Sequence, residues 1–183
     1  MYRSSLALML CLASGAVAAA DTEMGAEQIL MDANSNTGVG GQTGQRFAQV
    51  FELHDTGAVS HLMLPLGCQP QAVVRITLEA TTQGVPSGTV LASKDVPGYV
   101  MDAYPTAPGL VGMRMIEFPR APVLVPGVYA FTVSTKGKYG CVIWYGPAGN
   151  SYHYGDAYFI ANYNPPGWTP LGRDLAFQVF QRP

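Results

Sequence analysis

From Gln45 onward, hydrophobic and polar residues alternate with a period of two along much of the chain. In residues 45–53, QRFAQVFEL, one side of an extended chain carries Phe47, Gln49, Phe51 and Leu53. In residues 71–81, QAVVRITLEAT, one side carries Val74, Ile76, Leu78 and Ala80, and the other carries Arg75, Thr77 and Glu79. Successive side chains of a strand point to opposite faces of a sheet, so this pattern predicts half-buried β-strands.

Turns rich in proline and glycine divide these runs at short intervals. Clear examples are TTQGVPSG at 81–88, VPG at 125–127 and NPPG at 164–167. No window of about a dozen residues after residue 20 has the pattern of an amphipathic helix. We therefore predict an all-β fold, an antiparallel β-sandwich of the jelly-roll type with about 8–9 strands. The expected strands are approximately 45–53, 59–66, 72–81, 89–95, 113–118, 128–135, 139–145, 152–161 and 173–180.

Residues 21–44 have a different composition. A brief apolar run at 29–31 predicts a short edge strand, and the Gly/Asn/Thr-rich stretch that follows predicts a long loop. DANSNTG at 32–38 places Asp32, Asn34 and Asn36 at alternate positions, as in a calcium loop. It departs from the EF-hand pattern, because Gly38 comes one residue late and Thr43 stands where a bidentate glutamate is required. A calcium site of another kind and a plain turn both stay open. We expect residues 45–183 to form a single β-sandwich domain.

The first 20 residues have the features of a secretory signal peptide. Arg3 precedes an apolar run that is too short to span a bilayer, and small residues up to Ala20 offer a cleavage site. Cys11 lies inside the apolar run, so lipid attachment is not expected. We predict a secreted protein, extracellular or periplasmic, with no membrane span. Loss of Arg3 leaves 9 Lys and Arg against 12 Asp and Glu in the remaining 163 residues. With this acidic balance we expect no nucleic-acid partner.

Two cysteines remain after this processing, Cys68 and Cys141. An oxidising compartment favours a disulfide between them, which would close a loop of 73 residues. The alternative is two separate buried thiols. Neither cysteine has a CxxC or histidine partner at the spacing of a zinc site, and we expect no cofactor.

Several segments together resemble the jelly-roll sandwich domains of secreted bacterial surface proteins, including the choice-of-anchor domains. They are the opening Gln-x-Phe strand at 45–47, the GVPSGTVLAS hairpin at 84–93, the PVLVPGVY strand entry at 122–129 and the closing DLAF strand at 174–177. The resemblance spans nearly the whole chain after residue 20. It implies the architecture, because each shared segment is mainly a folding signal.

Catalytic patterns are weak in this sequence. Sugar hydrolysis needs two carboxylates facing one cleft, and the glutamates on expected strands, Glu52, Glu79 and Glu117, are typical of a polar face. There is no GxSxG motif, and His54, His61 and His153 have no local partner pattern. We therefore expect a protein that is not an enzyme, and the alternative is a small jelly-roll glycoside hydrolase.

Aromatic residues are concentrated near the C-terminus. The chain has 7 Phe, 2 Trp and 10 Tyr, and nine of these aromatic residues lie in the segment from Tyr139 to Trp168. In a continuous strand over 152–161, Tyr152, Tyr154, Asp156 and Tyr158 would share one face, and Ala157, Phe159 and Ala161 the other. The second set suits a core, and the first suits a half-exposed surface where rings pack and hydroxyls reach water.

This pattern predicts a ligand-binding aromatic face. Its expected residues are Trp144, Asn150, Tyr152, Tyr154, Asp156, Tyr158 and Trp168. The leading hypothesis is a secreted, non-catalytic module that binds carbohydrate or another cell-surface polymer. The alternative is a structural subunit whose aromatic strip packs on an identical or different protein. Tyrosine-rich strands also stabilise sheets without any ligand, and a proline-flanked tryptophan can simply close the end of a sandwich.

Overall fold

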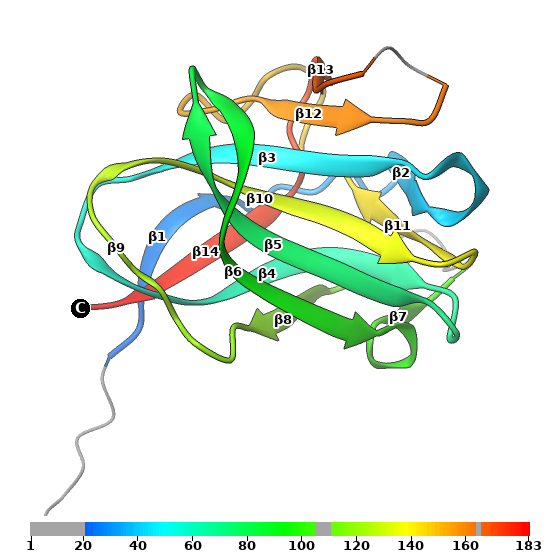
Figure 1. Ribbon diagram of the computed structural model, residues 1–183, viewed down its shortest axis with the longest axis horizontal. Helices are drawn as coiled ribbons and strands as arrows, with labels where there is room; N and C mark the ends of the chain where they lie inside the picture. Colours follow the sequence, from blue (N-terminus) through cyan, green and yellow to red (C-terminus); the bar gives the residue numbers. More distant parts are fainter. Residues whose placement is uncertain (1–20, 105–110, 164–165) are drawn as a thin grey trace, which may run out of the picture.

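The structure is a computed structural model that describes residues 21–104, 111–163 and 166–183. Within these ranges the chain forms two sheets that pack as a sandwich (Figure 1). The strands are β1 (Glu23–Gln28), β2 (Asn36–Gly40), β3 (Arg46–Leu53), β4 (Gly57–Cys68), β5 (Val73–Thr82), β6 (Val85–Pro97), β7 (Asp102–Ala103), β8 (Met113–Glu117), β9 (Val123–Leu124), β10 (Gly127–Lys136), β11 (Gly140–Trp144), β12 (Ala157–Ile160), β13 (Thr169–Pro170) and β14 (Phe177–Arg182). Two short 3-10 helices, η1 (Gly41–Thr43) and η2 (Gly98–Val100), complete the elements.

The long strand β4 is central to the eight-stranded sheet. This sheet has the order β1-β14-β4-β11-β2, and β7, β8 and β9 also pair with β4. His61 of β4 lies opposite Phe180 of β14 and opposite Glu117 of β8, so the strand has a neighbour on each side. Every pair in this sheet is antiparallel except the two-residue β4–β7 pair.

The six-stranded sheet has the order β13-β12-β3-β10-β5-β6, and all its pairs are antiparallel. Its central strands are β3, β10 and β5. The hairpin of β5 and β6 extends beyond them, and its tip turns across β3, which β6 contacts (Figure 1). This curl covers part of the sheet surface that faces away from the core.

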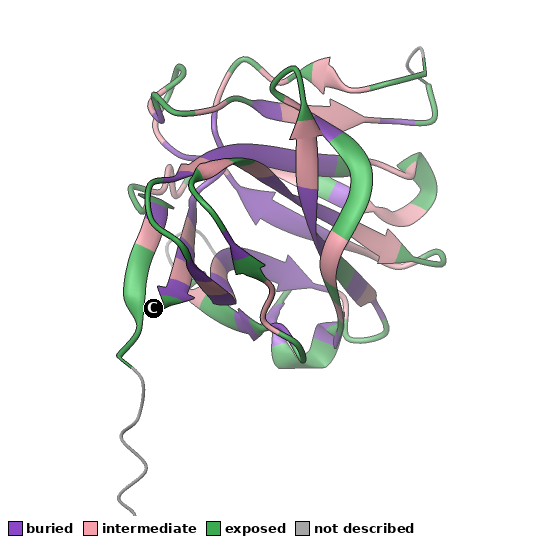
Figure 2. Ribbon diagram, turned by 60° about the vertical axis from the view of Figure 1, so that its left-hand side comes forward, coloured by how far each residue is buried: buried purple, intermediate pink, exposed green. Residues whose placement is uncertain are grey.

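Aromatic rings from both sheets meet in the core. The ring centroid of Phe131 on β10 lies 5.5 Å from that of Phe177 on β14, and Phe51 on β3 lies 6.4 Å from each of them. Such ring pairs contribute about 0.5–1.5 kcal/mol beyond the burial of their area. Figure 2 shows buried residues mainly in the inner strands, whereas exposed residues lie at turns and along edge strands such as β1 and β6.

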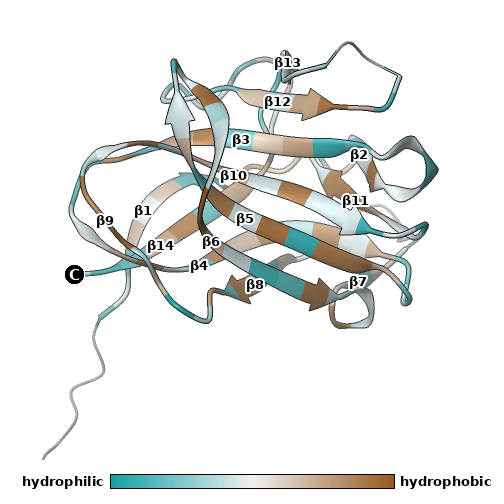
Figure 3. Cartoon of the chain, in the orientation of Figure 1, coloured by the Kyte–Doolittle hydropathy of each residue, from teal (hydrophilic) through white to brown (hydrophobic). Residues whose placement is uncertain are grey.

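Alternation along β5 agrees with the sequence pattern. Val74, Ile76 and Leu78 are fully buried in the core, whereas Arg75 is exposed on the opposite side. The same period of two is visible as alternating hydropathy along β5 in Figure 3. The predicted all-β antiparallel sandwich is confirmed, and each of the nine predicted ranges overlaps one strand.

The interpretation of residues 21–44 is partly wrong. The edge strand is Glu23–Gln28, and the apolar run at 29–31 lies outside it. The stretch predicted as a loop contains β2, which pairs along its whole length with β11. Backbone groups make this pairing, so a glycine-rich segment can take part when a neighbouring strand offers unpaired N–H and C=O groups.

Cys68 and Cys141 form the predicted disulfide, with their Cα atoms 4.0 Å apart. The two residues lie directly opposite each other on β4 and β11. The bond therefore ties two neighbouring strands of the eight-stranded sheet. No helix in the described part of the chain is both long and apolar enough to cross a membrane.

Candidate functional site

A buried carboxylate holds the loop that connects β11 to β12. Asp174, which is fully buried, accepts a 2.7 Å hydrogen bond at Oδ2 from the backbone N–H of Tyr152. Its Oδ1 accepts a 3.1 Å hydrogen bond from Nε2 of Gln49, and Oε1 of Gln49 accepts one from the N–H of Leu175. Burial raises the pKa of Asp174, although these hydrogen bonds oppose the rise.

Tyr152 belongs to the core. Only 7% of this residue is exposed, its ring contacts Phe177 at 5.2 Å, and its hydroxyl accepts a hydrogen bond from the N–H of Glu52. Tyr154 is 55% exposed and lies beside the ring of His54 at 5.4 Å. The two tyrosines are in edge contact, 5.8 Å apart, but only Tyr154 faces solvent.

The continuous strand predicted over 152–161 is wrong. The strand begins only at Ala157, because residues 153–154 form a turn. The predicted row of tyrosines is therefore divided: Tyr152 lies inside, Tyr154 lies at a loop tip, and Tyr158 lies on β12. Trp144 is also absent from any open aromatic face, since it is 3% exposed and packs with Val111 and Val142.

The candidate binding surface is the outer face, defined as the side of the six-stranded sheet that points away from the core. Phe47 and Phe51 of β3 are core residues, so Ala48 between them points to the outer face. Strand register places one row of residues straight across all six strands. In order from β13 to β6 they are Pro170, Tyr158, Ala48, Thr132, Thr77 and Ser93.

One edge of the outer face combines aromatic rings with a cation. Tyr158 is half-buried on β12, and the next outward position, Ile160, lies opposite Arg46. The guanidinium carbon of Arg46 is 5.8 Å from the ring centroid of Trp168. We call Tyr158, Trp168 and Arg46 the aromatic edge. The sequence pattern anticipated both rings but not Arg46, which could have been found from its place one residue before the inward-facing Phe47.

Two further predicted residues adjoin the aromatic edge. Asn150 donates a 2.7 Å hydrogen bond through Nδ2 to Oδ1 of Asp156, and both side chains are exposed. Partial burial, with a smaller effect of the Asp156 charge, raises the pKa of Tyr158. Asp156 faces Val50, and Tyr158 lies opposite Ala48, so the carboxylate is at the end of β12 away from Arg46. Four of the seven predicted residues thus lie along β12 and its flanking segments, and not in one cluster.

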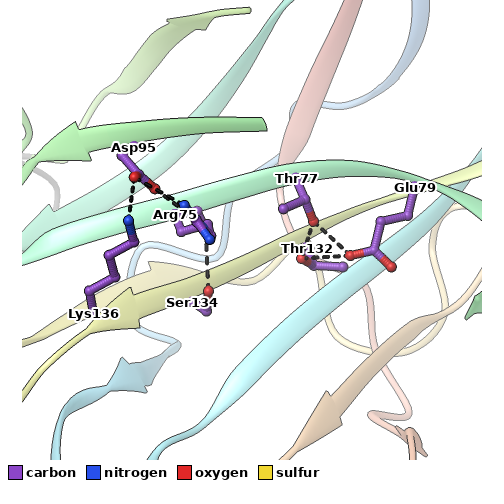
Figure 4. A network of polar contacts seen from close by, with 7 residues as sticks. All are labelled: Arg75, Thr77, Glu79, Asp95, Thr132, Ser134 and Lys136. Carbon is purple, nitrogen blue, oxygen red and sulfur yellow. Dashed lines mark hydrogen bonds and ion pairs between the residues drawn. The ribbon is translucent and has the colours of Figure 1, made fainter. Parts of the chain in front are cut away.

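Charged residues lie on β5, β6 and β10 of the outer face (Figure 4). Arg75 on β5 forms a 2.8 Å ion pair with Asp95 on β6, and Lys136 on β10 reaches the same carboxylate at 2.5 Å. The hydrogen bond from Arg75, followed by that from Lys136, lowers the pKa of Asp95 to about 2. These exposed side chains are not in the predicted site, because sequence alternation shows a polar face without showing which strands lie side by side.

Glu79 belongs to a closed polar cluster on the same face (Figure 4). Its Oε1 accepts hydrogen bonds from the hydroxyls of Thr77 and Thr132, at 2.7 and 3.3 Å. Its Oε2 accepts one from the N–H of Gly88, at the curled hairpin tip. Glu79 is only 7% exposed, so this carboxylate stabilises the curl.

The other two candidate glutamates lie elsewhere. Glu52 is on β3, with a carboxylate oxygen 3.9 Å from Nδ1 of His54. Glu117 is on β8 of the other sheet, opposite His61. The three glutamates are therefore spread over three strands. In the middle of the outer face Ala48, Thr77 and Thr132 are buried, so its exposed groups lie towards its borders.

In the candidate calcium loop, the carboxylate of Asp32 forms an ion pair with Arg173. Asp32 accepts the N–H of Asn34 at Oδ1, and its Oδ2 lies 3.3 Å from a guanidinium nitrogen of Arg173. Arg173 also stacks on the ring of Tyr145 at 4.2 Å. Asn36 opens β2. Within the described residues, no group of three or more His, Cys, Asp or Glu side chains could hold a metal ion.

Comparison with known proteins gives no assignment: no family model matches the chain, and no curated protein matches it. The geometry of the outer face is therefore the basis for inferring function.

Proposed function

We propose that the protein is a secreted, non-catalytic module of the choice-of-anchor-like sandwich type, which binds carbohydrate or another cell-surface polymer through the aromatic edge. The observation that carries the proposal is the grouping of Trp168, Tyr158 and Arg46 at the open edge of the six-stranded sheet. Asn150 and Asp156 add exposed hydrogen-bonding groups at the end of β12 where Tyr158 lies, away from Arg46.

Sugar rings suit such a surface for a chemical reason. Their C–H faces are apolar and pack on aromatic rings, whereas their hydroxyls need donors and acceptors at the rim. Trp168 and Tyr158 are both half-buried, so their positions are fixed by neighbours while part of each residue stays accessible. A polymer would contact an edge that is already ordered, which reduces the entropy lost on binding.

The disulfide supports the proposed export. Disulfides persist mainly in oxidising compartments, and the Cys68–Cys141 bond joins two directly paired strands. Fractionation of cells that express residues 1–183 tests this part of the proposal. We expect the processed, oxidised form outside the cytoplasm, and retention of the full-length chain in the cytoplasm would contradict it.

Affinity electrophoresis of residues 21–183 in gels that contain single polysaccharides tests the binding itself. We expect retardation by at least one polymer, and a loss of about tenfold in affinity for Tyr158→Ala or Trp168→Ala. Tyr99→Ala is the matched control, because Tyr99 is 72% exposed in η2 and lies outside the outer face. Equal retardation of all these variants, or no retardation by any polymer, would reject the aromatic edge as a binding surface.

A second candidate function, a structural subunit, is favoured by an observation on the opposite side of the sandwich. Phe180 on β14 stacks on His61 at 4.4 Å and lies opposite Met24 of β1, while Met115 of β8 lies opposite Met63 of β4. Met24 and Met115 are 47% and 57% exposed. Flexible methionines beside an aromatic ring are common where proteins bind one another.

Light scattering after size exclusion tests this second candidate for self-association. If the surface around Met24 and Met115 on the eight-stranded sheet joins two copies, residues 21–183 should run as a dimer. The double variant Met24→Gln/Met115→Gln should then run as a monomer. Val90→Gln is a control, because Val90 is also exposed but lies on β6 of the other sheet. A monomer at all concentrations would remove self-association from consideration.

A further inference from the structure

We propose that the polymer bound at the aromatic edge is an acidic polysaccharide, whose carboxylate or sulfate groups contact Arg46 and the Arg75–Lys136 pair. This inference rests on the proposed function and adds the charge of the ligand. Its basis is the distribution of charge along the strands of the outer face.

Arg46 provides a cation with no acidic partner. It is exposed, and no ion pair joins it to an Asp or Glu among the described residues. Its position beside the ring of Trp168 suits a planar, weakly hydrated guanidinium. The N–H groups of arginine match the two oxygens of a carboxylate or the oxygens of a sulfate.

Further cations lie at the same end of the outer face. On one side of β10, Ser134 lies opposite Arg75 of β5. On the other side, Val133 pairs with Phe47 of β3, so the next residue of β10, Ser134, is level with the preceding residue of β3, Arg46. Arg46 and Arg75 are thus separated by two strand spacings, about 10 Å. Lys136 is the next outward residue after Ser134. Because Arg75 and Lys136 share the single carboxylate of Asp95, this group carries a net positive charge.

Acidic groups lie at the opposite end of the same strands. Asp156 faces Val50 of β3, with its carbonyl accepting the N–H of Val50, and Glu52 is the next outward residue of that strand. Glu79 lies at this end of β5 and is covered by the hairpin tip. Charge complementarity therefore places the acidic groups of a polymer near Arg46, Ser134 and Arg75, with a sugar ring against Trp168.

The test compares polygalacturonate, which is acidic, with dextran, which is neutral, by calorimetry on residues 21–183. We expect tighter binding of polygalacturonate, weakened when NaCl rises from about 0.05 to about 0.5 M. Arg46→Gln should lower the affinity for polygalacturonate by about tenfold, and Arg75→Gln/Lys136→Gln by a similar factor. Arg182→Gln is the matched control, because Arg182 is exposed on β14 of the other sheet. It should leave the affinity unchanged.

The outcomes separate the two proposals. One result would be a neutral polymer that binds with the same affinity as polygalacturonate and loses that affinity in Tyr158→Ala and Trp168→Ala. This result would overturn the proposal that the ligand is acidic and would leave the proposed aromatic edge intact. Binding to neither kind of polymer would remove both. An equal loss for Arg182→Gln and Arg46→Gln would show unspecific attraction, and equal affinity for poly-L-glutamate would show that no sugar is recognised. Either result overturns the inference.

Discussion

The backbone N–H of Tyr152 donates a 2.7 Å hydrogen bond to the buried carboxylate of Asp174. This bond joins the β11–β12 loop to the segment just before β14. The loop carries Asn150, Tyr154 and Asp156, so the buried carboxylate fixes the base of a surface whose tips are exposed. Gln49 of β3 completes the arrangement by bonding both Asp174 and the N–H of Leu175.

Asp174→Asn should destabilise the protein by about 1–3 kcal/mol. The carboxamide has one acceptor oxygen, so its NH2 group would face either the N–H of Tyr152 or the amide of Gln49, both of which donate. Urea unfolding, monitored through tryptophan fluorescence, measures the free energy of unfolding. Asp156→Asn is the control, because Asp156 is exposed and should change this free energy by less than about 0.5 kcal/mol. Equal effects of the two variants would show that burial of the carboxylate is unimportant.

The charge of Asp174 should also give a distinct pH dependence. Its pKa is raised above 3.8 in the folded protein, so the folded state binds this proton more tightly than the unfolded state does. As pH falls from neutral through the folded pKa towards 3.8, the wild type should gain stability relative to Asp174→Asn. Unfolding free energies of both proteins across this range measure the gain. A difference that stays constant with pH would contradict the raised pKa.

Asp95 should show the opposite sign. Its pKa is lowered to about 2, so its ion pairs stabilise the protein above 3.8 and this stability is lost as pH falls towards 2. The group is largely exposed, and solvent screening keeps the effect small. Comparison of wild type with Asp95→Asn between neutral pH and about pH 2 measures it. A wild-type advantage that grows on acidification would contradict the ion pairs.

Gly155→Ala should destabilise the loop by about 1–3 kcal/mol. An added Cβ would lie 2.3 Å from the carbonyl oxygen of Val50, which is backbone and cannot move aside cheaply. Gly112→Ala is the matched control, because its added Cβ would meet no atom within 4 Å and its backbone needs no positive φ. Thermal unfolding of both variants checks the prediction. A melting temperature that is equally lowered by both would show that the close approach to Val50 carries no cost.

Reduction of the Cys68–Cys141 disulfide should lower stability by about 2–5 kcal/mol without loss of the β-sheet circular dichroism signal. The core rings of Phe51, Phe131 and Phe177 pack without help from either cysteine. Thiol titration under denaturing conditions before and after reduction, combined with urea unfolding, tests this. Two free thiols in oxidised, exported protein would show that the bond does not form in solution.

The sequence by itself determined the fold class and most strand positions. In β5, the alternation of Val74, Ile76 and Leu78 with Arg75 is a local property, because the geometry of a strand alone sends neighbours to opposite faces. The inward position of Phe159, which stacks on Phe47, follows from the same rule. The pairing of the two cysteines was also predictable, since only two remain after residue 20.

Only the tertiary structure decided the composition of the candidate site. β2 forms from a glycine-rich segment because β11 offers it backbone partners, and no side-chain pattern encodes that. Tyr152 is drawn inward because Asp174, 22 residues away, bonds its backbone and Phe177 packs on its ring. Arg46 meets Trp168, and Arg75 meets Lys136 through Asp95, only because sheet order makes them neighbours. Alternation gives the face on which a side chain lies, whereas the order and register of strands distant in sequence decide what lies beside it.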